Sequence, residues 1–217
     1  MGKIFAYDSP LIQTINKIVD CVFVSLLWLI FSIPIITFGA STAALYYTVN
    51  KVIRHHRSSV FKEFWRSFKE SFKQSTIVWL LMLVAYYILG VDCIFIYKKA
   101  VAGTASIYLM IPFLLTAVFV TIWFIYVLAT ISRFQNNLKA IMKNSAFFVI
   151  RHLLRSILLI IIFAASAVVS MFVPVAIVIA PTVGMFLMTV VLESIFKKYM
   201  SEEDLETEAK KNQTYYV

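Results

Sequence analysis

Asp92 is the residue whose type and position most directly suggest chemistry. It lies in an apolar run, residues 76–97, that carries no other charge. A carboxylate inside a membrane is costly and often marks a cation or substrate site. Near the outer end of its run, Asp92 can also lie at interface depth, already in water, or pair with Lys98 or Lys99. We favour the interface position and keep Asp92 as the candidate intramembrane polar residue.

A second set of candidates is a stretch in which aromatic and basic residues alternate. Phe61, Phe64, Trp65, Phe68 and Phe72 recur at the spacing of one helix face, with Lys and Arg on a neighbouring face. Such a helix is expected to lie along a membrane surface or to pack against the protein itself. The candidate interface and lipid-binding residues are Lys62, Trp65, Arg66, Phe68, Lys69, Phe72 and Lys73.

A third candidate is a turn rich in small residues. Pro34 disfavours continuing a helix through Ile33. Thr37 is a candidate helix cap, and Gly39 begins a run of small residues that permits close backbone packing. We treat Pro34, Thr37 and Gly39 as a motif turn.

Familiar catalytic and metal-binding patterns are not found in the sequence. His55, His56 and His152 show no metal-ligand spacing, and Cys21 and Cys93 lie within apolar runs as small hydrophobic residues do. No nucleophile elbow or Gly-rich phosphate loop occurs, and no Asp or Glu pair is placed for acid–base catalysis. We therefore predict no catalytic residue, no metal and no cofactor.

The composition indicates the environment that must position these residues. Of 217 residues, 61% are hydrophobic and 14% are charged, and the mean hydropathy is +0.87. Soluble domains carry about 45–50% apolar and about 25% charged residues, so lipid must solvate much of this chain. The net charge of +9 lies in short segments between apolar runs, which favours topology control and anionic lipid over nucleic acid as its explanation.

The lengths of the apolar runs predict an all-α transmembrane bundle. A helix needs about 20 apolar residues to cross a bilayer. We predict a single domain over residues 1–200, followed by an acidic cytoplasmic tail over 201–217. The predicted spans are about 14–33, 37–54, 76–97, 104–131, 153–172 and 174–195, and two cytoplasmic amphipathic helices, here called elbows, are predicted at 60–74 and 135–149.

The count of spans depends on residues 37–54, which are barely long enough to cross. With six spans, every Lys and Arg except Lys98 and Lys99 lies on one side, and both termini are cytoplasmic. With five spans, Lys3 and Lys17 join the minority side and the amino terminus lies outside. We prefer six spans; the carboxyl terminus is cytoplasmic in both.

Two stretches resemble the YesL-like family of bacterial membrane proteins. One is residues 28–47, WLIFSIPIITFGASTAALYY, and the other is residues 61–76, FKEFWRSFKESFKQST, where Ser71 stands at a position at which the family often has Asn. The resemblance extends to the order of the spans and the total length. It implies a domain of unknown function in the plasma membrane of mainly Gram-positive bacteria, whose members are commonly found beside carbohydrate ABC importers.

Three functions follow as hypotheses. The first is a non-catalytic accessory or regulatory component of a carbohydrate ABC uptake system, with the permease subunits as partners. The second is a small-solute or ion transporter or channel in its own right. The third is a scaffold that interacts with membrane lipid through the first elbow.

Overall fold

The computed structural model describes residues 10–54, 59–104, 106–134, 136–200, 202–203 and 205–206. Within these ranges all regular structure is helical and no strand occurs, so the all-α prediction is confirmed. The α-helices are α1 (Pro10–Ser32), α2 (Phe38–Thr48), α3 (Val60–Val101), α4 (Ile111–Arg133), α5 (Leu138–Arg151), α6 (Leu153–Phe172) and α7 (Ala180–Phe196). Short 3₁₀ helices precede α2, α4 and α7 at Ile35–Thr37, Ile107–Met110 and Pro174–Val178, and a π-helix, η2 (Val49–Ile53), extends α2.

Among the described residues, four helices are long and apolar enough to cross a membrane. They are Ile15–Ser32, Val60–Val101, Ile107–Arg133 and Leu153–Phe172. Their outer faces are apolar: Leu115 is 64% exposed and Leu154 is 84% exposed. Side chains of this kind left on the surface require an apolar solvent, which supports a membrane protein.

The longest helix, α3, joins the predicted first elbow to the apolar run that follows it. Residues 60–74 and 76–97 belong to one continuous helix of 42 residues, about 63 Å long at 1.5 Å per residue. No proline or glycine lies between Val60 and Leu89, so nothing in this stretch interrupts the hydrogen-bond ladder. The basic segment, residues 60–74, therefore lies in the same helix as the apolar run and is not a separate elbow helix.

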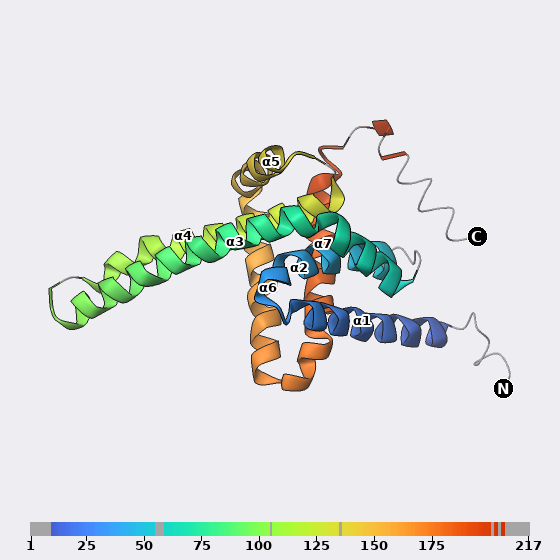
Figure 1. Ribbon diagram of the computed structural model, residues 1–217, viewed down its shortest axis with the longest axis horizontal. Coiled ribbons are helices and arrows are strands. Elements are labelled where there is room, and N and C mark those ends of the chain that lie inside the picture. Colours follow the sequence, from blue (N-terminus) through green and yellow to red (C-terminus); the bar gives the residue numbers. More distant parts are fainter. Residues whose placement is uncertain are drawn as a thin grey trace.

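Figure 1 shows two helical hairpins that leave a common centre in different directions. One is formed by α3 and α4, the other by α6 and α7, and the helices of each hairpin pack side by side. Helix α2 lies where the hairpins meet and contacts α1, α3, α4 and α7. Helix α5 packs on α4 and lies beside the start of α6 (Figure 1).

The small residues of α2 make this central position possible. Ala40 and Ala44 pack with α1 and α3, Ala43 packs with α3 and α4, and Tyr46 packs with α4 and α7. At Gly39, an added Cβ would lie 2.6 Å from Ser75 O and 2.7 Å from Trp79 Cβ. The backbones of α2 and α3 thus touch at a place where only glycine fits.

The motif turn connects α1 to α2 through specific hydrogen bonds. Thr37 Oγ1 donates to Phe31 O at 2.6 Å and to Pro34 O at 2.8 Å, closing the turn from inside. Trp79 Nε1 of α3 donates to Ile35 O at 2.6 Å. The Trp79 ring also packs on Phe38 with centroids 4.6 Å apart. The turn is therefore held both by its own threonine and by α3.

Replacing Trp79 with phenylalanine tests this attachment. The ring contact with Phe38 is retained, while the hydrogen bond to Ile35 O is lost, which we expect to lower the free energy of unfolding by about 0.5–1.5 kcal/mol. The measurement is reversible unfolding of the purified protein in mixed micelles. Unchanged stability would mean that the turn does not depend on α3.

The α-helix of the last apolar segment begins several residues after the start of the predicted span 174–195. Residues 174–178 form a 3₁₀ turn, and α7 starts only at Ala180, with Pro181 in its first turn. Proline suits the start of a helix because it lacks the amide hydrogen that would be unpaired there. With 17 residues, about 26 Å, α7 falls short of the membrane length that α6 reaches.

Candidate functional site

The most buried charged group among the described residues is the carboxylate of Glu193 in α7. Its side chain is 2% exposed and pairs with Arg133 at the end of α4, with Nη2 3.1 Å from Oε2. Tyr46 Oη donates to Oε1 at 2.8 Å, and Asn50 Nδ2 donates to the same oxygen at 3.0 Å. We call Glu193, Arg133, Tyr46 and Asn50 the Glu193 cluster. It connects α2, η2, α4 and α7 where the two hairpins meet.

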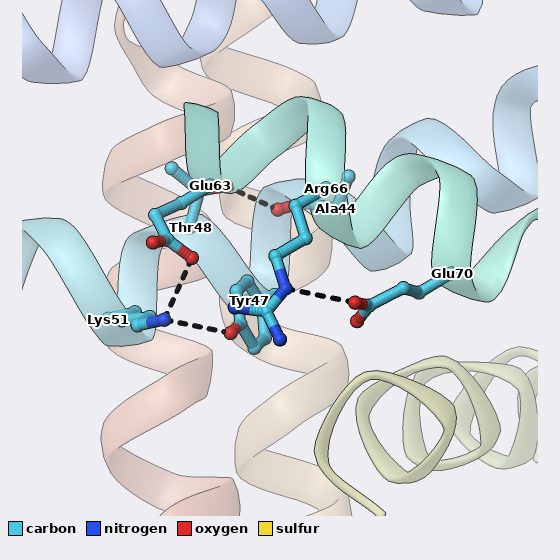
Figure 2. A network of polar contacts seen from close by, with 7 residues as sticks. All are labelled: Ala44, Tyr47, Thr48, Lys51, Glu63, Arg66 and Glu70. Atoms are coloured by element: carbon cyan, nitrogen blue, oxygen red, sulfur yellow. Dashed lines mark hydrogen bonds and ion pairs between the residues drawn. The ribbon is translucent and has the colours of Figure 1, made fainter. Parts of the chain in front are cut away.

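A second buried carboxylate, Glu63, lies at the start of α3. Lys51 Nζ of η2 is 2.8 Å from Glu63 Oε2 and also donates to Tyr47 Oη at 3.0 Å. Figure 2 shows the Lys51 side chain directed at both groups, while the Arg66–Glu70 pair lies one turn further along α3. The Glu63 side chain is 6% exposed. We call Glu63, Lys51 and Tyr47 the Glu63 cluster.

The π-helix η2 supplies neighbouring residues to both clusters. Asn50 points to Glu193 on α7, and Lys51 points to Glu63 on α3. In a π-helix each backbone hydrogen bond spans five residues, one more than in an α-helix, and such segments are frequent at functional sites. Here it lets two successive side chains fix two separate helices.

A cavity of about 480 Å³ lies between the hairpins. Its walls come from α1, α2, α3, α4, α6 and α7, and none of its lining residues is charged. The aromatic part of the wall is Trp28, Phe38, Tyr46, Trp79, Tyr86, Phe124 and Phe163. Volumes of this size are typical of small-molecule sites.

The hydroxyl groups on the wall are already engaged within the protein. Thr42 donates to Phe38 O, Ser166 to Phe163 O and Ser170 to Ser166 O. Tyr86 is hydrogen-bonded to Thr121, which in turn donates to Ala117 O, and Tyr46 donates to Glu193. A sugar needs free donors and acceptors to replace its water. The cavity therefore suits an apolar ligand better than a carbohydrate.

The predicted interface residues divide between the two sides of α3. Phe64 and Phe68 are buried, and both pack against Phe31 of α1 with centroids 5.6 and 5.1 Å apart. The others remain on the surface, with Lys69 Nζ 4.8 Å from the Trp65 ring centre and Arg66 bound to Glu70. Leaving out Arg66, which is paired with Glu70, we call the exposed set the basic–aromatic face: Phe61, Lys62, Trp65, Lys69, Phe72 and Lys73.

The structure does not bring Asp92 to any of these features. It is half-buried in the carboxyl-terminal half of α3, does not line the cavity, and forms no ion pair with Lys98 or Lys99 within the described residues. Of the histidines, His55 and His56 lie outside the described residues, and His152 Nε2 is 3.0 Å from Tyr199 Oη. No group of three His, Cys, Asp or Glu side chains gathers in the described part of the chain.

Sequence reasoning missed the role of Glu193. In the sequence Glu193 lies near the end of an apolar run and four positions before Lys197, which is the spacing of an ion pair along one helix face. The structure pairs it with Arg133 instead, because its side chain faces α4 and α2 rather than the outside of α7. The sequence offered one signal. Glu193 is a single carboxylate in an otherwise uncharged run, and Arg133 is a single cation at the end of another apolar run.

Comparison with known proteins gives one similarity. Residues 21–93 match the family model described as protein of unknown function, DUF624. This is the YesL-like family that the motif stretches resemble. The matched DUF624 region includes the motif turn, α2, η2 and most of α3, so it contains the central helix and Glu63 but neither Arg133 nor Glu193. Neither the curated proteins nor the solved structures gave a match.

Proposed function

We propose that the chain is a non-catalytic integral membrane protein that serves as an accessory or regulatory component of a carbohydrate ABC uptake system. The observation that carries the proposal is the basic–aromatic face. Its tryptophan and phenylalanine rings and three lysines are exposed, while Phe64 and Phe68 fix the same helix to α1. Exposed aromatic residues on a rigid helix are typical of protein interfaces. The setting that the family resemblance implies, beside carbohydrate ABC importers, suggests a permease as the partner.

Neutralising the basic–aromatic face tests the proposal. The variant Lys62→Gln/Lys69→Gln/Lys73→Gln should lose most of the permease subunits that co-purify with the tagged wild-type protein from native membranes. The control is Lys139→Gln/Lys143→Gln, because these exposed lysines lie on α5, outside the face. Equal recovery from both variants, or no permease with the wild type, would contradict an accessory role.

The same variants distinguish the accessory role from the alternative of a lipid-binding scaffold. If the face binds anionic lipid, the triple variant should bind vesicles containing phosphatidylglycerol more weakly than the wild type does. A lipid scaffold would show this loss with no permease recovered from any variant. An accessory subunit would lose the permease whether or not vesicle binding changes.

A second candidate function is transport, favoured by the cavity between the hairpins. Its uncharged wall and engaged hydroxyls suit an apolar or amphipathic solute better than an ion or a sugar. Flux of such a solute into liposomes that contain the purified protein would support this function.

We further propose the six-segment topology in the bacterial plasma membrane, with α5 and the first half of α3 on the cytoplasmic side. Residues 38–53 are 16 helical residues, about 24 Å long and shorter than the bilayer core. Other helices surround α2, so it needs no lipid-facing surface of its own.

An epitope tag at the amino terminus decides between six and five segments. We expect the tag to be protected from protease in intact spheroplasts and cleaved after permeabilisation, as a tag at the carboxyl terminus should be. Cleavage of the amino-terminal tag in intact spheroplasts would favour five segments.

A further inference from the structure

We infer that the cavity holds an acyl chain of a membrane lipid, which enters sideways from the bilayer between the two hairpins. The inference does not depend on the accessory function proposed above. It starts from the wall of the cavity, which has no charged residue and whose hydroxyl protons are all donated within the protein. Such a wall offers contact surface and no free hydrogen-bond donor, which suits a hydrocarbon chain.

The cavity is continuous with the apolar outer surface of the α6–α7 hairpin. Phe163 and Ile177 line the cavity and are themselves 42% and 39% exposed. At the other end the lining residues Met188 and Leu192 are 4% and 0% exposed. The cavity thus has a mouth among side chains that face the membrane and a closed end beside the Glu193 cluster.

The closed end of the cavity explains why an acyl chain can enter it and a polar lipid head group cannot. Leu192 and Tyr46 form part of the wall, and the carboxylate that follows Leu192 is turned away to Arg133 and Asn50. A head group at this end would lose its water without gaining a partner. A peptide helix is also excluded by size, since a cylinder about 10 Å wide would fill 480 Å³ with about one turn.

Photocrosslinking tests the inference with the full-length protein. The protein is placed in nanodiscs of phosphatidylethanolamine and phosphatidylglycerol, in which part of the phosphatidylglycerol has a diazirine in the middle of one acyl chain. After illumination, adducts are located by mass spectrometry. We expect adducts at Met188, which lipid can reach only through the cavity, as well as at Ile161, which is 57% exposed on α6.

Filling the cavity provides the matched comparison. Ala167→Trp places a large ring on the wall, whereas Ala164→Trp places the same ring on the same helix outside the lining. We expect most of the Met188 adduct to be lost in Ala167→Trp and retained in Ala164→Trp, with the Ile161 adduct unchanged in both. If Ala167→Trp does not fold, Ser170→Phe with Ala165→Phe as control makes the same comparison.

Two results would overturn the inference. One is an Ile161 adduct without any Met188 adduct in the wild type. The other is an undiminished Met188 adduct in a folded cavity-filled variant. Neither result bears on permease recovery, so the accessory function and the lipid site fail separately.

Discussion

Replacing Glu193 with alanine should lower the free energy of unfolding by about 3–5 kcal/mol, the usual effect of removing one partner from a buried ion pair. The loss arises because Arg133, whose side chain is 13% exposed, keeps its charge and loses the carboxylate that balances it. Tyr46 and Asn50 lose an acceptor at the same time. The measurement is reversible unfolding in mixed micelles, compared with the wild type.

The exposed Arg66–Glu70 pair is the control for this variant. Its side chains are 57% and 52% exposed, so Glu70→Ala should change stability by no more than about 1 kcal/mol. The double variant Arg133→Met/Glu193→Leu leaves no buried charge in the pair and should recover part of the loss. A Glu193→Ala protein as stable as Glu70→Ala would show that the Glu193 cluster does not hold α4 and α7 together.

The second large effect is expected at Gly39. In Gly39→Ala the new Cβ would lie 2.6 Å from the Ser75 carbonyl oxygen and 2.7 Å from Trp79 Cβ. The first of these neighbours is backbone, so α2 and α3 must move apart, which we expect to cost about 1–3 kcal/mol. The separation should also be visible as a lower melting temperature and a broader size-exclusion peak.

Gly90 is the control for this steric argument. It lies in the same helix as Ser75 and Trp79, and an added Cβ there meets nothing within 4 Å. Gly90→Ala should therefore be neutral or stabilising by at most about 1 kcal/mol, since alanine favours helix more than glycine does. Of two substitutions of the same kind, only the one at Gly39 is thus expected to destabilise the protein. Equal effects at the two glycines would contradict close contact between α2 and α3.

The sequence predicts the helical class well because apolar run length is a local property. The runs at 76–97 and 153–172 fall within α3 and α6, and residues 107–131 of the third run lie in the 3₁₀ turn and α4. The small residues after Gly39 indicate close packing for the same local reason, and the cluster contacts of α2 agree. Short-range patterns therefore account for the elements and for the character of the central helix.

The functional features depend on contacts between distant segments, which periodicity does not encode. The pairing of Arg133 with Glu193 joins two helices whose relative placement depends on α2. The aromatic face of residues 61–72 reads as uniform, yet Phe64 and Phe68 are buried against Phe31 while Phe61 remains exposed. The cavity likewise exists only because six helices leave it between them.

The five-residue π-helix makes the length of the chain between Phe38 and Val60 as important as its composition. Deleting one residue from 49–53 would restore ordinary α-helical spacing and rotate the following residues by about 100° around the axis. Asn50 and Lys51 would then no longer be able to bind Glu193 of α7 and Glu63 of α3 at the same time. Natural relatives of this chain should accordingly tolerate exchanges of residue type in this segment far more readily than insertions or deletions.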